Sequence, residues 1–245
     1  MAAPEITIDI AKKVLATIDA GLVKGVGKPV PGQMCVEAAV CYAMGLPHSD
    51  DPICVSRALR RLKIRLNDAN WSSDAARANG LRRLGLAQLG SRDVLDDKEF
   101  ARRVAELSIR KQLPIALRAA ASVQRDTKHQ EALMAAAKRC EKEGSRQSAL
   151  DAQAAAYAAY VAADAADAAY AAYAYAYAYA DADAADAADA AAAAVAAYAA
   201  AAAKKSKAAW RDEVLSDFAE DVVQILIDMK APGCQWLALT EQQSA

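Results

Sequence analysis

Residues 151–203 form a tract of small and simple side chains, and the rest of the chain must fold around it. The tract holds 35 Ala, 8 Tyr, 7 Asp, 2 Val and 1 Gln, with no Gly, Pro, Lys or Arg. Alanine is the strongest helix former, so nothing in the tract would end a helix. One helix of this length would reach about 80 Å, longer than ordinary globular helices. We therefore predict at least two helices within residues 147–203, packed side by side, with their Asp faces in solvent or paired with arginine.

Tyrosine alternates with alanine in the middle of this tract. Alternation normally indicates a strand, but alanine is depleted in strands, so helix is the better interpretation. Four alternating tyrosines would point in four directions on a helix, and some of them would be exposed. We predict that the exposed members bind a protein partner or a second copy of the chain. The alternative is that the rings only fill gaps between Ala-lined helices. The candidate binding residues are Tyr173, Tyr175, Tyr177, Tyr179, Asp181 and Asp183.

The segments on either side of the tract have the apolar spacing of amphipathic helices separated by short breaks. We expect Gly45 to cap one helix and Pro114 to interrupt or restart another. The pattern predicts an all-α fold, either a helical bundle or an irregular helical array. We expect a boundary near Gly144, between a mixed helical domain over 1–144 and an Ala-rich segment with a C-terminal helix over 145–245. The expected helices cover residues 8–22, 33–44, 55–66, 74–89, 96–109, 115–123, 128–141 and 210–226.

Cysteine usage and hydropathy bear on the compartment. Five cysteines are an odd number, and no apolar leader precedes them. Reduced cysteines in a cytoplasmic protein fit this pattern best. No window has the length and apolar character of a membrane span, because the Ala tract is too rich in Asp.

The segment from Gly27 to Pro52 is the densest in reactive side chains. Cys35 lies where a loop becomes a helix, and a helix N-terminus favours the thiolate. Gln33 could donate to an oxyanion. This arrangement resembles the Gln and helix-terminal Cys of papain-like proteases and glutamine-hydrolysing enzymes. A general base is less clear, since His48 is expected two to three turns from Cys35. A Cys-dependent hydrolase or transferase using Cys35, Gln33 and His48 is therefore the alternative to a non-enzymatic protein.

The same segment also offers metal-ligating side chains. Cys35 or Cys41, with His48 and Cys54, could bind a metal, but the spacing of structural zinc sites is missing. The simpler interpretation is that Cys41 and Cys54 are small buried hydrophobes. We therefore predict no metal and no cofactor.

Positive charge is concentrated between residues 56 and 83, where eight Lys or Arg stand against two Asp. Such a patch could contact phosphate or an acidic surface. Alternatively, its arginines pair with the aspartates of the Ala tract. No phosphate loop or nucleic-acid motif accompanies it, so nucleic acid is the less favoured partner. The candidate basic patch consists of Arg57, Arg60, Arg61, Lys63 and Arg65.

The segment ALDAQAAAYAAYVAADAADAAYAAY, followed by a Trp-containing amphipathic helix, resembles the Ala-rich helical arrays of Imm5-like immunity proteins. This resemblance is compositional and spans residues 115–230. It implies a protein that neutralises toxins in bacterial competition. The segment GKPVPGQMCVEAAVCYAMGLPHSDDP, with KIRLNDANWSS further on, resembles uncharacterised bacterial and phage proteins. Together the resemblances imply a prokaryotic or viral protein in a conflict setting.

From these observations we expect a non-enzymatic, macromolecule-binding protein, such as an immunity or anti-defence inhibitor. Its partner is expected to be a protein, with self-association and a helical scaffold role as further alternatives. Contact with a membrane is not expected.

Overall fold

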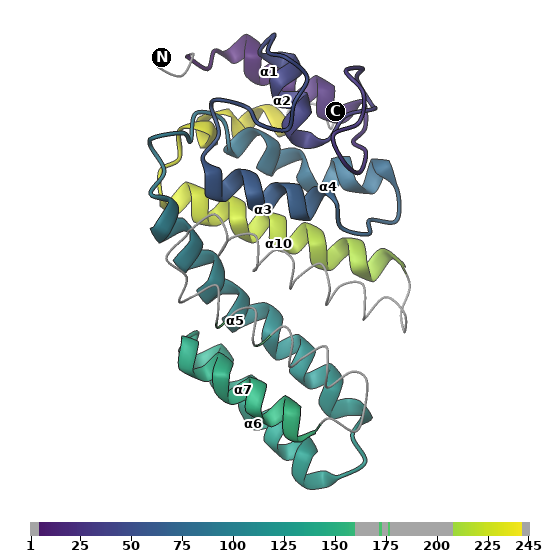
Figure 1. Ribbon diagram of the computed structural model, residues 1–245, viewed down its shortest axis with the longest axis vertical. Helices are drawn as coiled ribbons and strands as arrows, with labels where there is room; N and C mark the ends of the chain where they lie inside the picture. Colours follow the sequence, from purple (N-terminus) through teal and green to yellow (C-terminus); the bar gives the residue numbers. More distant parts are fainter. Residues whose placement is uncertain (1–4, 160–171, 173–175, 177–207, 242–245) are drawn as a thin grey trace.

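The computed structural model describes residues 5–159, 172, 176 and 208–241, and the fold of these residues is all-α (Figure 1). The described residues contain no strand, and an isolated antiparallel bridge joins Gly27 to Met34. The prediction of fold class is thus confirmed. The elements are α1 (Ile8–Asp19), α2 (Val36–Ala43), α3 (Arg57–Asn67), α4 (Asp74–Ala87), α5 (Asp97–Val123), α6 (Thr127–Glu143), α7 (Arg146–Ala158), α10 (Ala208–Asp228) and the 3-10 helix η1 (Pro232–Thr240).

Short polar side chains set the first residue of most of these helices. Each accepts a hydrogen bond from a backbone N–H in the first turn, which has no partner inside the helix. Ser73 caps α4, and Asp126 caps α6. The cap of α2 is unusual, since the Sγ of Cys35 accepts from the N–H of Ala38 at 3.3 Å.

Gly45 ends α2 in the predicted way. Its φ of +70° is left-handed, a conformation that glycine adopts without a steric cost. The N–H of Gly45 donates to the carbonyl of Tyr42, and the N–H of Leu46 donates to the carbonyl of Cys41. These two bonds make a Schellman motif, which satisfies carbonyls at the end of the helix.

Pro114 does not interrupt its helix, and the prediction that it would is wrong. Helix α5 runs without a break from Asp97 to Val123, with Pro114 buried inside it. A proline removes one backbone hydrogen bond from a helix interior. Here α5 packs along α6 and also contacts α3, α7 and α10. This packing stabilises the helix on both sides of the proline.

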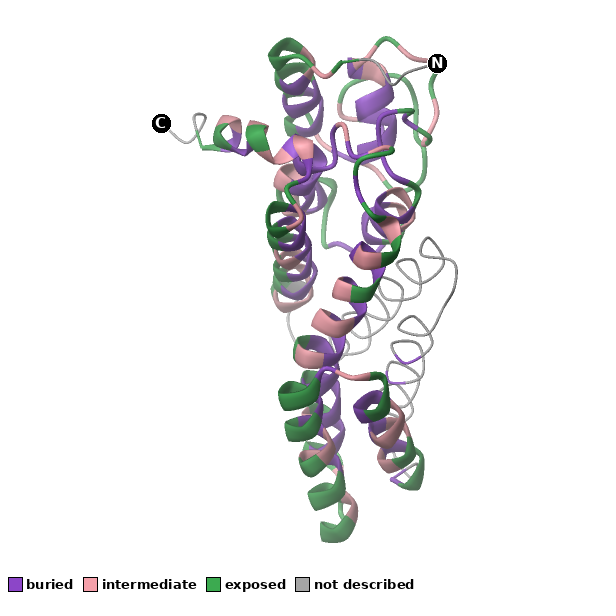
Figure 2. Cartoon of the chain, turned by 90° about the vertical axis from the view of Figure 1, so that its left-hand side faces the viewer, coloured by how far each residue is buried: buried purple, intermediate pink, exposed green. Residues whose placement is uncertain are grey.

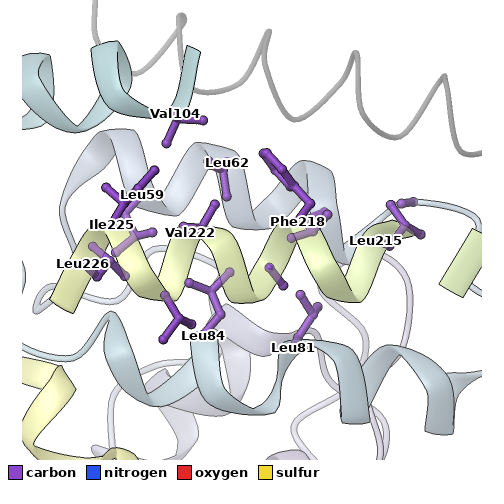
Figure 3. Packing of buried hydrophobic residues seen from close by; sticks show 14 of the residues in the cluster. Leu59, Leu62, Leu81, Leu84, Val104, Leu215, Phe218, Val222, Ile225 and Leu226 are labelled. Atoms are coloured by element: carbon purple, nitrogen blue, oxygen red, sulfur yellow. The ribbon is translucent and has the colours of Figure 1, made fainter. Parts of the chain in front are cut away.

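In the upper group of helices in Figure 1, α10 packs along α4 and also contacts α5 and η1. Figure 3 shows Leu215, Phe218 and Val222 of α10 between the leucines of α3 and those of α4. The facing side chains on α3 and α4 are Leu59, Leu62, Leu81 and Leu84, all fully buried. Burial of each such side chain contributes about 1.5–3 kcal/mol to folding. Helix α10 therefore completes a core that α3 and α4 leave open, although it follows them by more than 100 residues in the sequence.

The second half of α5 extends away from this group and forms a separate layer with α6 and α7 (Figures 1 and 2). Leu113 and Leu117 of α5 are buried there with Leu133 and Ala137 of α6. The outer faces of this layer are exposed. The long helix α5 thus connects the two parts of the structure.

The boundary predicted near Gly144 falls between two helices that pack against each other, α6 and α7. Helix α10, which belongs to the second predicted segment, packs on α4 of the first. The two predicted segments are therefore in contact through the described helices, and their division near Gly144 stays a prediction. The prediction of two or more helices within residues 147–203 falls mostly outside the described residues.

Candidate functional site

Cys35 is almost closed off from solvent at the first turn of α2, with 4% of its surface exposed. Burial raises the pKa of its thiol to about 11, and outweighs the lowering by the backbone N–H groups of Ala38 and Glu37. The buried position thus disfavours the acidic thiol that the hydrolase or transferase alternative needs. Desolvation of the charged form exceeds the favourable effect of the helix end.

Gln33 and His48 are both exposed, on the loops before and after α2. The Nε2 of His48 lies 3.1 Å from the carbonyl oxygen of Gly27. Among the described residues, no hydrogen bond joins His48 or Gln33 to the thiol of Cys35. The structure therefore places the three predicted catalytic residues in one region without the contacts that a nucleophile and its base require.

A buried ion pair between α2 and α3 is the feature of this region that the sequence analysis missed. The Nζ of Lys63 lies 3.1 Å from Oε1 of Glu37, and both side chains are fully buried. Apart from this contact, neither group has a hydrogen-bond partner among the described residues. Burial raises the pKa of Glu37 and lowers that of Lys63, while each partner opposes the shift of the other. The signal was present, since Lys63 lies on the same helical face as Leu59 and Leu66.

The predicted basic patch on α3 is smaller than expected. Lys63 cannot belong to it, because it is buried against Glu37. Arg60 is half-buried and its guanidinium lies 2.8 Å from Oδ1 of Asp50 and 3.3 Å from Oδ1 of Asp51. Arg57 and Arg65 are exposed, and Arg61 is half-buried.

Three further arginines of the basic segment have partners outside the Ala tract. Arg77 is buried and donates to the carbonyls of Leu22 and Asn67. Arg82 pairs with Asp19, and Arg83 pairs with Glu220. These hydrogen bonds and ion pairs hold α4 to its neighbours. The three arginines therefore have a structural role, whereas the sequence suggested that they belong to a surface that contacts a partner.

The cysteines do not gather into a metal site in the part of the chain that the structure describes, where no group of three or more His, Cys, Asp or Glu could hold an ion. Burial raises the pKa of Cys41 to about 12, and those of Cys140 and Cys234 to about 11. The Sγ of Cys54 donates to Sδ of Met44 at 3.4 Å.

The Tyr and Asp surface predicted in the Ala tract lies outside the described residues. It stays a prediction for Tyr173, Tyr175, Tyr177, Tyr179, Asp181 and Asp183.

The loop between α1 and α2 is the clearest exposed feature near α2, and we call residues 24–33 the α1–α2 loop. Lys28 donates through its N–H to the carbonyl of Gln33 at 2.7 Å, which closes the loop. Its base is held by Asp68, whose Oδ1 accepts from the N–H of Gly25 at 2.8 Å. Despite these bonds every residue from 24 to 31 is exposed, including Val26 at 37% and Val30 at 46%.

The geometry defines an all-α protein with an ordered, exposed loop and a buried ion pair next to it. Comparison with protein-family models, with curated proteins and with solved structures finds no match. None of the described helices is both long enough and apolar enough to cross a membrane.

Proposed function

We propose that this protein acts by binding another macromolecule, a protein, and performs no chemistry on it. The observation that carries the proposal is the α1–α2 loop, which is fixed by hydrogen bonds yet exposes valine and proline side chains. Single exposed apolar residues are common, but a cluster of them on one ordered loop is typical of a binding surface.

The chemistry of the loop indicates the surface that it fits. Lys24 and Lys28 flank the apolar residues, and neither makes an ion pair with a described residue. Cations at the rim of an apolar contact favour a partner whose complementary surface is acidic. We therefore propose an acidic protein partner with an apolar depression that receives Val26 and Val30.

The resemblance to Imm5-like immunity proteins implies the kind of partner, a toxin or a defence protein in bacterial or phage conflict. An inhibitor of this type works by occupying its target, so it needs no activated nucleophile. The raised pKa of Cys35 supports this proposal over a cysteine-dependent hydrolase.

Site-specific photo-crosslinking tests the proposal. A photoreactive amino acid replaces Val30 in the loop or, as a matched control, Val94, which is 63% exposed ahead of α5. We expect position 30, and not position 94, to crosslink one protein in a bacterial lysate. The purified protein should then bind the wild-type chain directly.

Charge reversal gives the second arm of the test. The double change Lys24→Glu and Lys28→Glu should weaken binding to the purified partner, whereas Lys138→Glu on the exposed face of α6 should not. Equal crosslinking at both positions, or capture of nucleic acid in place of a protein, would overturn the proposal.

A further inference from the structure

A small pocket lies between the first turn of α2 and the end of α3, below the start of the α1–α2 loop. Its volume is about 120 Å³. Val26 and Ile64 supply apolar walls, and Glu37, Asp50 and Asp68 are among the polar residues that line it. An engineered cavity of about 150 Å³ holds a benzene molecule, so this pocket has room for a ligand of roughly six non-hydrogen atoms or fewer.

The charges around the pocket do not cancel. Lys63 is paired with Glu37, and Arg60 is paired with Asp50. Asp68 has no ion-pair partner among the described residues, since its Oδ1 accepts from the N–H of Gly25 and from Nδ2 of Asn67. The three carboxylates and two cations leave one net negative charge beside the pocket.

Two helix ends meet at the pocket, and they differ in the partial charge that they present to a ligand. Asp68 is the C-terminal cap of α3, where the helix end carries partial negative charge. At the N-terminus of α2, the N–H groups of Val36 and Ala38 already donate to Oδ1 of Asn67 and Sγ of Cys35. The uncompensated field is therefore negative, and it favours a cation.

Glu37 provides an independent indication that a hydrogen-bond donor is missing. It is fully buried and lines the pocket, and while its Oε1 lies 3.1 Å from Nζ of Lys63, its Oε2 accepts no hydrogen bond from a described residue. A buried acceptor without a donor is costly, so a ligand with N–H groups would stabilise this site.

We propose that this pocket binds a small organic cation that carries several N–H donors, namely a short alkylguanidinium or alkylammonium ion. The ion faces the carboxylates of Asp68 and Asp50 and donates to Oε2 of Glu37, and its alkyl group contacts Val26 and Ile64. This site and the macromolecular contact proposed above share Val26, but they differ in their other residues: the pocket is lined mainly by residues of α2 and α3, whereas the contact surface consists of Val30 and the loop lysines.

An NMR titration of the full chain with methylguanidinium tests the proposal, with N-methylurea as a neutral ligand of nearly the same shape. We expect saturable shifts of the backbone amides of Gly25, Cys35 and Asn67 with methylguanidinium. N-methylurea should bind at least about tenfold more weakly, because it lacks the charge. If neither compound causes saturable shifts, or if both bind equally, the pocket holds only solvent and the proposal fails.

Variants locate the site within the chain. Asp68→Asn keeps the acceptor for the N–H of Gly25 and removes the charge, so it should weaken methylguanidinium binding by about tenfold or more. Asp217→Asn on the exposed side of α10 is the matched control and should bind as the wild type does. If Asp68→Asn does not fold, Asp50→Asn tests the same charge, and the wild-type comparison of the two ligands decides the outcome in any case. Unchanged binding in the folded pocket variant would also overturn the proposal.

Discussion

Glu37 and Lys63 carry opposite charges in a place where water does not reach either of them. Desolvation of two ions costs several kcal/mol each, and their attraction offsets this cost only while both partners are present. The directions of the two pKa shifts follow from the same balance, since burial disfavours both charged forms. The pair therefore makes the packing of α2 on α3 sensitive to the loss of either residue.

A double-mutant cycle measures this dependence. Glu37→Gln or Lys63→Met alone should each lower the free energy of unfolding by about 3–5 kcal/mol, because a buried partner loses its counter-charge. The double variant should cost much less than the sum of the two. Urea denaturation of the four proteins gives the coupling energy, and strictly additive losses would contradict an interacting pair.

Lys230 has a φ of +58°, a left-handed conformation that side chains other than glycine rarely adopt. It follows α10 at the position where Gly45 follows α2, and its N–H donates to the carbonyl of Ile227. Lys230→Gly should relieve this strain and raise the free energy of unfolding by about 1 kcal/mol. Lys142→Gly, within α6, is the control and should lower it by about 1 kcal/mol.

The cysteines give a residue-scale test of the non-enzymatic proposal. With pKa values raised to about 11 or above for Cys35, Cys41, Cys140 and Cys234, the folded protein should react slowly with iodoacetamide at neutral pH. Mass spectrometry of alkylated peptides over a range of pH checks this. Rapid, selective alkylation of Cys35 near pH 6 would instead favour the hydrolase or transferase alternative.

At the scale of elements, the first turn of α5 carries a cluster of ion pairs around Glu99. Its carboxylate accepts hydrogen bonds from Arg102 and Arg103, which lower its pKa from 4.5 to about 2. A lowered pKa in the folded state stabilises the protein above pH 4.5, and this contribution is lost as pH falls toward 2. Since the group is partly exposed to solvent, we expect a contribution below about 1 kcal/mol.

The variant Glu99→Gln should therefore show a smaller loss of stability than the wild type between pH 4.5 and 2. The midpoint of urea unfolding at several pH values gives the comparison. Glu131→Gln, an exposed carboxylate on α6, should behave as the wild type does. An identical acid response in Glu99→Gln and the wild type would refute the role of this cluster.

At the scale of the whole molecule, the order of elements along the chain differs from their order in the core. Helix α10 follows the Ala tract in sequence, yet it packs against α4, α5 and η1. The leucines of α3 and α4 that face it would be exposed without it. Because folded domains are stable by only about 5–15 kcal/mol, the N-terminal helices depend on this late helix.

A fragment of residues 1–144 should therefore not unfold cooperatively by itself. Addition of a peptide of residues 208–241 should restore helical circular dichroism and a cooperative melt, whereas the same peptide with Phe218→Asp should not. A cooperative melt of the fragment alone would show instead that the boundary predicted near Gly144 separates two independent domains.

The sequence by itself determined the helical fold class and, to within about three residues, the ends of most of the predicted helices. These features depend on local chemistry: the period of the apolar residues, the side chains that cap at Ser73 and Asp126, and the freedom of Gly45 to adopt a positive φ. The same local rules failed at Pro114, where packing of α5 on its neighbours outweighs the cost of one missing hydrogen bond.

Only the tertiary structure decided the burial and the pKa values of the residues at the candidate site. The charge of Lys63 and the helix-terminal position of Cys35 are visible in the sequence, but their burial depends on how α2, α3 and the α1–α2 loop pack together. Solvation and charge partners set the pKa and the accessibility of a side chain, and both come from residues distant in the sequence. For this reason Lys63 is half of a buried ion pair and not part of an exposed basic patch. The thiol of Cys35 caps α2 in a buried position, where the helix end does not activate it.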